Sequence, residues 1–332
     1  MLPGETSAVP ADFAEQLRQS SALLKQVRAE VGKVIVGQRY MVDRLLVALL
    51  SDGHVLLEGV PGLAKTTAVK ALASTLHASF SRIQFTPDLL PADVIGTQIY
   101  NPRDGGFTTR KGPIFTNLLL ADEINRAPAK VQSALLEAMQ ERQVTLAERT
   151  WPLPRPFLVL ATQNPIEQEG TYPLPEAQVD RFLMKLVVRY PSADEEREIL
   201  LRGNQPNPTI NAVMTPEQLL SMQALAQRVT VKPVLANYIV SLVQATRAPG
   251  GVSPKLGRYV QYGASPRATL ALAGCARSVA VLDGRDYATP DDVKDIALDV
   301  LRHRVVLTYE AEAEQVSTDD VIRELLASVK TP

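Results

Sequence analysis

The chain has 332 residues, of which 45% are hydrophobic, so it is long enough to bury the cores of two folded units. Its 35 Lys and Arg balance 36 Asp and Glu, and this balance gives no electrostatic support for a nucleic-acid partner. A single cysteine, Cys275, excludes an intrachain disulfide, and three scattered histidines show no zinc-site spacing, which together favour a reducing, cytoplasmic compartment.

The N-terminal region begins with a polar stretch, residues 1–12, that we expect to be a flexible tail. It lacks the basic start and apolar run of a signal peptide, and no apolar stretch of the chain has the length of a membrane span. Helical spacing of apolar residues starts at Phe13 and continues to Val31. The folded part is therefore predicted to begin at residue 13.

Residues 35–190 alternate apolar runs of strand length with helical patterns. This alternation is typical of a parallel sheet covered by helices, so we predict an α/β domain over residues 13–190. The predicted strands are Val55–Leu57, Ile83–Phe85, Leu118–Ala121, Phe157–Ala161 and Lys185–Val188.

A glycine-containing loop follows the first predicted strand and precedes a helical pattern from Ala68. Its residues are Gly59, Val60, Pro61, Gly62, Leu63, Ala64, Lys65, Thr66 and Thr67. Such a loop points backbone N–H groups at ATP phosphates, with Lys65 on the β and γ phosphates and Thr66 on magnesium. The alternative is a Gly-Pro turn before a surface helix.

Ala64 departs from the phosphate-loop pattern, because a glycine usually precedes the lysine. Alanine fits this position if the backbone there has a negative φ. Because Lys65 and Thr66 are intact beside it, we expect Ala64 to be a tolerated variant.

Two predicted hairpins interrupt the α/β pattern. Residues 86–115 are too long for a simple connection, and Asp104-Gly105-Gly106 between Tyr100 and Phe107 indicates a hairpin turn. The second hairpin, within residues 143–154, pairs Gln143–Leu146 with Thr150–Leu153 through Ala147, Glu148 and Arg149.

Polar residues end two of the predicted strands, where sheets of this kind bind ligands. Asp122 and Glu123 follow Leu118–Ala121; Asp122 is predicted to hold the magnesium shell and Glu123 to polarise the attacking water. The alternative is a pair of acids at a helix N-terminus. Asn164, after Phe157–Ala161, is predicted to hydrogen-bond the same water, or else to be a turn residue before Pro165.

The remainder, residues 191–332, is predicted to be an all-helical lid domain that starts after Tyr190 at Pro191. Several helices begin with a capping residue and a proline, as at Thr215-Pro216, Ser265-Pro266 and Thr289-Pro290. The predicted helices are Ala193–Arg202, Pro216–Val229, Pro233–Thr246, Pro266–Leu282, Pro290–His303 and Thr318–Val329.

Motifs in both predicted domains resemble the MoxR family of AAA+ ATPases, and the resemblance spans roughly residues 20–310. The matching runs are Gly59–Thr66 with its alanine, Ala121–Ala127, Ala161–Ala177 with Asp180–Phe182, Gly263–Arg267 and Asp283–Val293. The resemblance implies an AAA+ P-loop core with a helical lid, ATP and Mg²⁺ as cofactors, ATP hydrolysis, and assembly into a hexameric ring. It also implies remodelling of a protein partner, typically one with a von Willebrand A domain.

The resemblance further implies roles for individual residues. Arg181 would reach the γ phosphate of the neighbouring subunit, and Arg267 would sense the nucleotide of its own subunit. Val36, Gly37 and Gln38 would cradle adenine, although a helix-ending glycine is the alternative. The two hairpins would lie near the central pore and engage the partner, with a plain edge hairpin as the alternative for residues 143–154.

Two other functions compete with partner remodelling. A nucleic-acid motor is weakened by the balanced charge and by the lack of a basic stripe or aromatic stacking platform. A structural ring with negligible turnover would not need Lys65, Asp122, Glu123, Asn164, Arg181 and Arg267 together.

Overall fold

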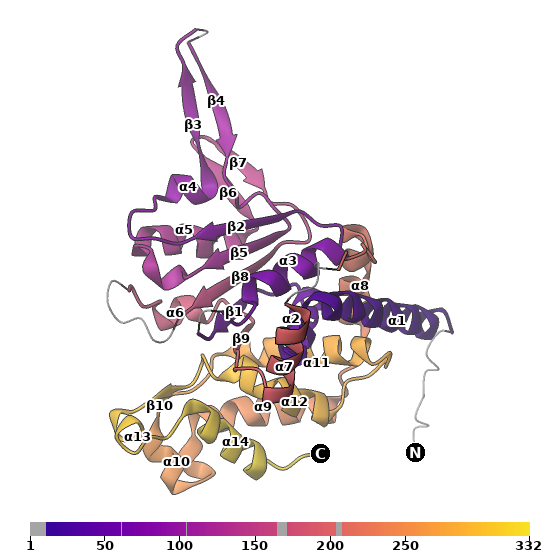
Figure 1. Ribbon diagram of the computed structural model, residues 1–332. Coiled ribbons are helices and arrows are strands. Elements are labelled where there is room, and N and C mark those ends of the chain that lie inside the picture. The colour runs from indigo at the N-terminus through magenta and orange to yellow at the C-terminus, as the bar shows by residue number, and fades with distance from the viewer. Residues whose placement is uncertain (1–10, 61, 104, 165–170, 204–207) are drawn as a thin grey trace, which may run out of the picture.

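A computed structural model describes residues 11–60, 62–103, 105–164, 171–203 and 208–332. Its centre is a parallel five-stranded sheet in the order β2-β5-β8-β1-β9 (Figure 1). The strands are β1 (Val55–Glu58), β2 (Phe80–Gln84), β5 (Leu118–Asp122), β8 (Leu158–Gln163) and β9 (Met184–Val187). The predicted α/β sheet is confirmed, although β2 begins three residues before the predicted run at Ile83.

Alternate residues of the strands enter two separate cores on the two faces of the sheet. Val55 and Leu57 of β1 contribute to one core, which also contains buried residues of the N-terminal and lid helices. Leu56 contributes to the other core. Burial on both faces requires the near-continuous apolar runs seen in the sequence, and it fixes the strand register that aligns the strand ends.

Helices cover both faces. The first core is packed by α1 (Ala11–Val34), α2 (Arg39–Leu50) and α3 (Lys65–Thr75). The second is packed by α5 (Ala129–Glu141) and the short helix η1 (Ile124–Arg126), with α4 (Pro91–Ile95) beside α5. Helix α1 begins at Ala11, two residues before the predicted start, and residues 1–10 of the predicted tail lie outside the described residues.

Both predicted hairpins are confirmed. Strands β3 (Gly96–Asn101) and β4 (Gly106–Lys111) pair antiparallel with Tyr100 opposite Phe107, and the ribbon projects far beyond the sheet (Figure 1). Asp104, in the predicted turn, lies outside the described residues. In the second hairpin, β6 (Gln143–Leu146) pairs with β7 (Arg149–Pro152), so two residues rather than three form the connection.

The lid contains mainly helices. They are α7 (Ala193–Arg202), α8 (Pro216–Arg228), α9 (Pro233–Arg247), η2 (Pro249–Gly251), α10 (Pro254–Tyr259), α11 (Pro266–Leu282), α12 (Pro290–Leu301), α13 (Tyr309–Ala313) and α14 (Thr318–Ser328). The predicted helical lid is confirmed, and the structure adds one short ribbon to it, in which β10 (Val260–Tyr262) and β11 (Val306–Leu307) pair antiparallel. Strands of three and two residues are too short to show a period in the sequence.

The capping residues predicted from the sequence do start their helices. Thr215, Ser265 and Thr289 each accept a hydrogen bond from a backbone N–H in the first turn of α8, α11 and α12. Helices α1 and α2 contact α11 of the lid as well as each other, so one continuous core joins the two parts of the chain. A domain boundary at residues 190 and 191 stays a prediction.

Candidate active site

The phosphate loop connects the buried strand β1 to α3, whose N-terminus opens onto a cavity of about 400 Å³. The cavity is lined by Gly62, Leu63, Ala64, Lys65, Thr66, Thr67, Arg82, Gln84, Asp122, Glu123, Thr162 and Asn164. It therefore collects candidate residues from the ends of β1, β2, β5 and β8. Val60 packs against the first core, and Pro61 lies outside the described residues.

Lys65 is half-buried at the start of α3, where its ammonium donates to the Gly59 carbonyl at 2.7 Å. Burial lowers the pKa of Lys65, and the attraction of Asp122 and Glu123 only partly offsets that effect. The partly buried ammonium is poorly solvated, so pairing with phosphate oxygens stabilises its charged form. This geometry supports the predicted role of Lys65.

Ala64 has a φ of 55°, so the negative φ that would let alanine fit here without strain is not present. The left-handed conformation lets the loop turn into α3, and an alanine methyl group makes it costly. Gly62, two residues earlier, also has a positive φ of 88°, which is the conformation that glycine permits without strain. The loop therefore retains its shape at the expense of strain at Ala64.

Replacing Ala64 by Gly is expected to raise the free energy of unfolding by about 1 kcal/mol, because it removes the strain of the left-handed backbone. Urea unfolding of the nucleotide-free protein measures the change. Ala193→Gly is the matched control, since Ala193 is an exposed residue in the first turn of α7 and should lose stability on substitution. An equal decrease in the free energy of unfolding in the two variants would show that Ala64 carries no strain.

Asp122 and Glu123 lie at the carboxyl end of β5, as predicted. The Thr162 hydroxyl, on β8, donates to Asp122 Oδ1 at 2.6 Å and accepts from the Glu123 backbone N–H at 2.8 Å. Glu123 has a φ of 56°, a strained conformation that turns its side chain out of the strand direction. The strand end thus holds two adjacent carboxylates in the same cavity as Lys65.

Two residues of β2 contact these carboxylates, and the sequence reasoning did not identify them. Arg82 donates to Asp122 Oδ2 at 2.6 Å, and Gln84 donates to Glu123 Oε2 at 2.9 Å. Arg82 also donates to the Gln84 side chain at 2.8 Å. Their spacing of two residues places both side chains on one face of an edge strand, a signal that was missed because the strand was predicted to start at Ile83.

Asn164 lies directly after β8 and lines the same cavity, with only 7% of its surface exposed. Its neighbours Pro165 to Gly170, part of the distinctive run in the sequence, lie outside the described residues. The placement supports the hypothesis that the Asn164 amide contacts a water beside the γ phosphate.

The segment Val36-Gly37-Gln38 connects α1 to α2. Gln38 donates to the Arg189 carbonyl at 3.0 Å, while a side chain at Gly59 would collide with the neighbouring Val188. The strand end of β9 therefore lies between this segment and the phosphate loop. A cavity of about 460 Å³ is lined in part by Gln38, Arg39, Tyr40, Arg189, Tyr190 and Glu195.

Gly37 has a φ of 64°, a left-handed conformation that glycine adopts without strain. The atoms nearest to an added Cβ belong to the flexible end of the Glu195 side chain, so the backbone conformation is the main reason for glycine here. Gly37 is not the residue that ends α1, because that helix stops at Val34. The segment and its cavity stay a predicted adenine site.

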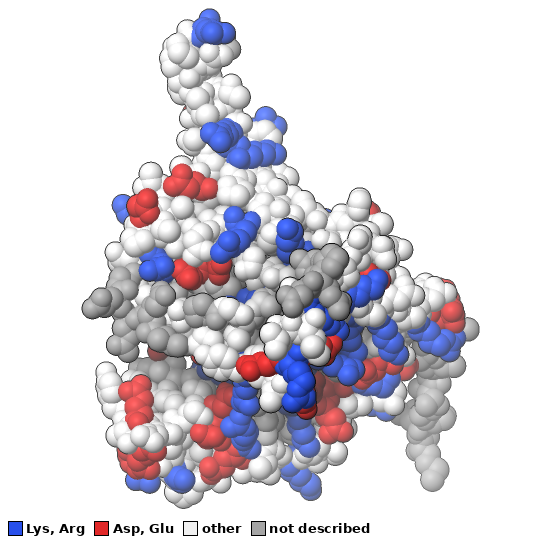
Figure 2. Space-filling model, viewed as in Figure 1, with Lys and Arg blue, Asp and Glu red and all other residues white. Residues whose placement is uncertain are grey.

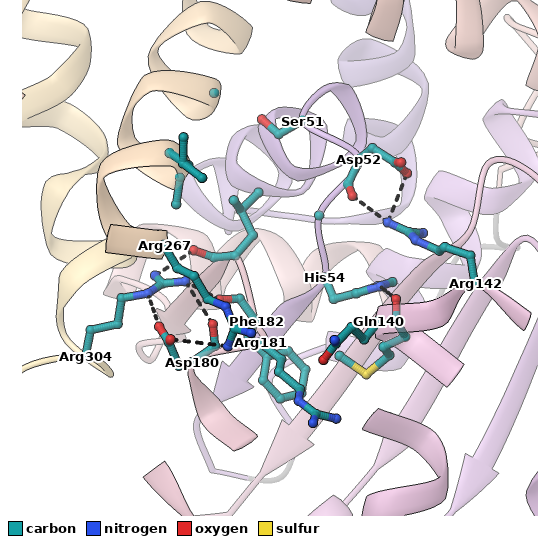
Figure 3. A pocket seen from close by; sticks show the side chains of 16 residues that line it. Ser51, Asp52, His54, Gln140, Arg142, Asp180, Arg181, Phe182, Arg267 and Arg304 are labelled. Atoms are coloured by element: carbon teal, nitrogen blue, oxygen red, sulfur yellow. Dashed lines mark hydrogen bonds and ion pairs between the residues drawn. The ribbon is translucent and has the colours of Figure 1, made fainter. Parts of the chain in front are cut away.

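Arg181 and Arg267 line one cavity beside the residues that precede β1 and β9 (Figure 3), whereas the phosphate loop follows the carboxyl end of β1. Arg267 contacts Asp180, and both arginines line a cavity that also contains His54, just before β1. Strand β1 spans roughly 13 Å at about 3.3 Å per residue, and the phosphate loop follows its other end.

The prediction that Arg267 senses the nucleotide of its own subunit stays a prediction, which this placement does not support. The start of α11 packs against the loop before β9, through Ser265 and Asp180, rather than against the phosphate loop. Arg181 fits the prediction better, since a finger for a neighbouring subunit must lie away from its own phosphate loop.

The donor set in the main cavity fits magnesium. Thr66 offers a hydroxyl and Asp122 a carboxylate, which are hard oxygen ligands, and phosphate and water oxygens complete the shell in sites of this type. Within the described residues no group of three or more His, Cys, Asp or Glu could form a protein-only metal site. A protein-only site is not needed for a metal ion that binds together with ATP, because the phosphates supply some of its ligands.

The visible surface mixes charges of both signs over the lid, and positive charge gathers near the tip and base of the β3–β4 ribbon (Figure 2). Arg103 follows β3 at the tip, and Arg110 and Lys111 lie at the end of β4. Among the described helices, none has both the length and the apolar character needed to cross a bilayer.

Comparisons with known proteins agree with this geometry. Residues 54–184 match the family model of ATPases associated with various cellular activities, and residues 257–325 match the AAA lid domain. The chain is 52% identical to the chaperone MoxR1 of Mycobacterium tuberculosis, over 99% of this chain and 89% of that protein. It is 32% identical to the protein MoxR of Methylorubrum extorquens, over 91% and 93% of the two chains.

A solved structure is similar throughout. A crystal structure from Cytophaga hutchinsonii, provisionally described as an ATPase, superimposes with a TM-score of 0.90 at 50% identity. The superposition covers 96% of this chain and 97% of the other. The two chains therefore share their fold over nearly their whole length.

Proposed function

The chain belongs to the MoxR family of AAA+ ATPases, and we propose that it uses ATP hydrolysis to remodel, mature or activate a client protein as a hexameric ring. The observation that carries the proposal is the division of the catalytic groups between the two ends of the sheet's strands, which are called here the phosphate-loop edge and the amino edge. Lys65, Asp122 and Glu123 lie at the carboxyl ends of the strands and Arg181 at the amino ends.

At the phosphate-loop edge, each residue has a separate task. The loop N–H groups and Lys65 bind the phosphates, while Thr66 and Asp122 would hold Mg²⁺, which would supply neutralisation of charge on the phosphate oxygens. Glu123 accepts a proton from the attacking water, and Asn164 orients that water. Gln84 and Arg126 must release the Glu123 carboxylate for this step, because both donate to Oε2 in the present structure.

At the other edge, Arg181 is available to a neighbour. Its guanidinium has no ion pair or hydrogen bond with any other described residue, although it lies in a cavity that also holds Asp180. A planar, permanently charged guanidinium stabilises the charge that spreads over γ-phosphate oxygens during transfer. We assign Arg181 and Arg267 together to the nucleotide of the neighbouring subunit, because they share one edge and one cavity.

Client contact is assigned to the β3–β4 ribbon. Tyr100 and Phe107 are 54% and 67% exposed, and their ring centroids lie 5.4 Å apart near the end of the ribbon. Exposed aromatic pairs are costly in water and typical of contact sites, and an isolated two-stranded ribbon gains stability from a partner. The relative named a chaperone supports a protein client, and a von Willebrand A domain protein is the class we propose.

The experiment uses a von Willebrand A domain protein from the same organism. We expect ATP-dependent remodelling of this client, measured as a change in its protease cleavage pattern, and loss of remodelling in the double variant Tyr100→Ser, Phe107→Ser. Basal ATP hydrolysis should persist in this variant because the ribbon lies outside both cores.

Tyr309→Ser provides the matched control, since Tyr309 is a 90% exposed tyrosine in the lid. It should leave remodelling unchanged. Remodelling without ATP, or at the parental rate in the ribbon variant, would contradict the proposal.

A further inference from the structure

The cavity of about 420 Å³ at the amino edge of the sheet gathers four arginines and two aspartates (Figure 3). Arg142 pairs with Asp52 at 3.2 Å, and Arg304 pairs with Asp180 at 2.8 Å. Arg181 and Arg267 are the two arginines that the proposed mechanism uses. Asp180, which immediately precedes Arg181, contacts Arg304 and Arg267 and has no assigned task.

Asp180 joins three elements through its two carboxylate oxygens. Oδ1 accepts from Arg304 Nε at 2.8 Å, at the C-terminal end of α12. Oδ2 accepts from the Ser265 hydroxyl at 3.0 Å, at the cap of α11, and faces Arg267 Nη1 at 3.5 Å. The aspartate therefore fixes the start of α11, which carries Arg267, to the loop that carries Arg181.

Arg304 also binds the loop that carries Arg181. Its side chain is only 3% exposed and donates to the carbonyls of Asp180, Phe182 and Leu183, so the backbone on both sides of Arg181 is anchored. Burial lowers the pKa of Arg304, and Asp180 opposes this effect. The carboxylate thus compensates a buried charge while it sets the loop conformation.

Arg267 is held loosely in comparison. Its side chain is 54% exposed, and 3.5 Å is long for a charge-assisted hydrogen bond. A phosphate oxygen of a neighbour can therefore replace Asp180 as its partner at little cost. The Ser265 and Arg304 bonds to Asp180 do not involve Arg267 and remain when it moves.

We propose that Asp180 is a positioning residue that sets the spacing of Arg181 and Arg267, so that both reach the nucleotide of one neighbouring subunit. This inference rests on the proposed sharing of active sites between subunits. Two arginines on separate elements act on one γ phosphate only if their relative position is fixed, and a misplacement of about 1 Å can cost on the order of a hundredfold in rate.

Two variants test the role of Asp180. Asp180→Asn should lower kcat by about tenfold to a hundredfold while the dissociation constant for a fluorescent ATP analogue stays within about twofold. Ser265→Ala removes one link without leaving Arg304 unpaired, and should lower kcat by roughly threefold to tenfold. Ser317→Ala, which removes a serine cap from α14, is the matched control and should leave kcat unchanged.

Mixed rings separate positioning from a loss of folding. Asp180→Asn keeps an intact phosphate-loop edge, so co-assembly with Lys65→Ala should restore activity at about a quarter of the interfaces of a randomly mixed ring. Co-assembly with Arg181→Ala should restore none, because both proteins are then defective at the same edge. Lys65→Ala with Arg181→Ala is the reference mixture.

Each outcome decides the matter. Recovery with Lys65→Ala but not with Arg181→Ala supports the proposal. Two outcomes overturn the role of Asp180 and leave site sharing intact, provided that the reference mixture recovers activity. One is that Asp180→Asn does not recover activity with Lys65→Ala. The other is that Asp180→Asn recovers activity with Arg181→Ala. A parental kcat for folded Asp180→Asn also overturns it, and a silent reference mixture overturns site sharing as well. If Asp180→Asn does not fold, equal kcat values for Ser265→Ala and Ser317→Ala overturn the proposal.

Discussion

An Arg181→Ala protein is expected to hydrolyse ATP about a thousandfold more slowly than the parent, because fingers of this kind contribute on the order of 10³ or more to kcat. Arg181 lies at the amino edge of the sheet, remote from the phosphate loop of its own chain. Its removal should therefore leave ATP binding to an isolated subunit unchanged while it removes transition-state stabilisation in the neighbour. The loss should appear in kcat and not in nucleotide affinity.

Steady-state phosphate release and fluorescent-nucleotide binding measure the two quantities. Arg155→Ala is the matched control: Arg155 lies at the same edge, 3.8 Å from Asp52, with 70% of its side chain exposed. It should change kcat by no more than about twofold. The parent should also lose specific activity on dilution, since a finger acts only in an assembled ring. A monomer with full, concentration-independent activity would show that Arg181 has no task in a neighbour.

Glu123→Gln is expected to bind ATP normally and to lower kcat by about a hundredfold or more, the usual contribution of a general base. Glutamine preserves the size of the side chain and can still meet Gln84 and Arg126, which contact the Glu123 carboxylate at 2.9 and 3.0 Å. It cannot accept a proton from water. Loss of turnover with retained binding would therefore report the missing base rather than a damaged site.

Single-turnover phosphate release with ATP in the presence of Mg²⁺ provides the measurement. Glu137→Gln, an exposed glutamate on α5, is the matched control and should behave as the parent. Phosphate release at the parental rate by Glu123→Gln would refute the assignment of the base. The remaining carboxylate at that strand end would then be Asp122.

The sequence allowed the sheet and most helices to be predicted because their signals are local. Fully buried strands need continuous apolar runs. A capping residue followed by proline marks the N-terminus of a helix, as at Thr289-Pro290. Strands β10 and β11 escaped because they have only three and two residues, and their pairing depends on helices from distant parts of the chain. Tertiary contacts, rather than local preference, determine such elements.

The phosphate-loop edge was likewise predictable, since parallel strands bring their carboxyl ends together in a known order. Three features were not. The positive φ of Ala64 is set by the turn into α3, and the contacts of Arg82 depend on the pairing of β2 with β5. The place of Arg267 beside Asp180 depends on how the lid packs, which no local pattern encodes.

The most direct test of shared active sites is a mixture of two inactive proteins, Lys65→Ala and Arg181→Ala, assembled into common rings. Differently tagged subunits, captured on one tag and detected by the other, establish that the rings are mixed. About a quarter of the interfaces then combine an intact phosphate loop with an intact finger, so ATP hydrolysis should return to roughly that fraction of the parental rate. Mixed rings that remain as inactive as either protein alone would contradict the account.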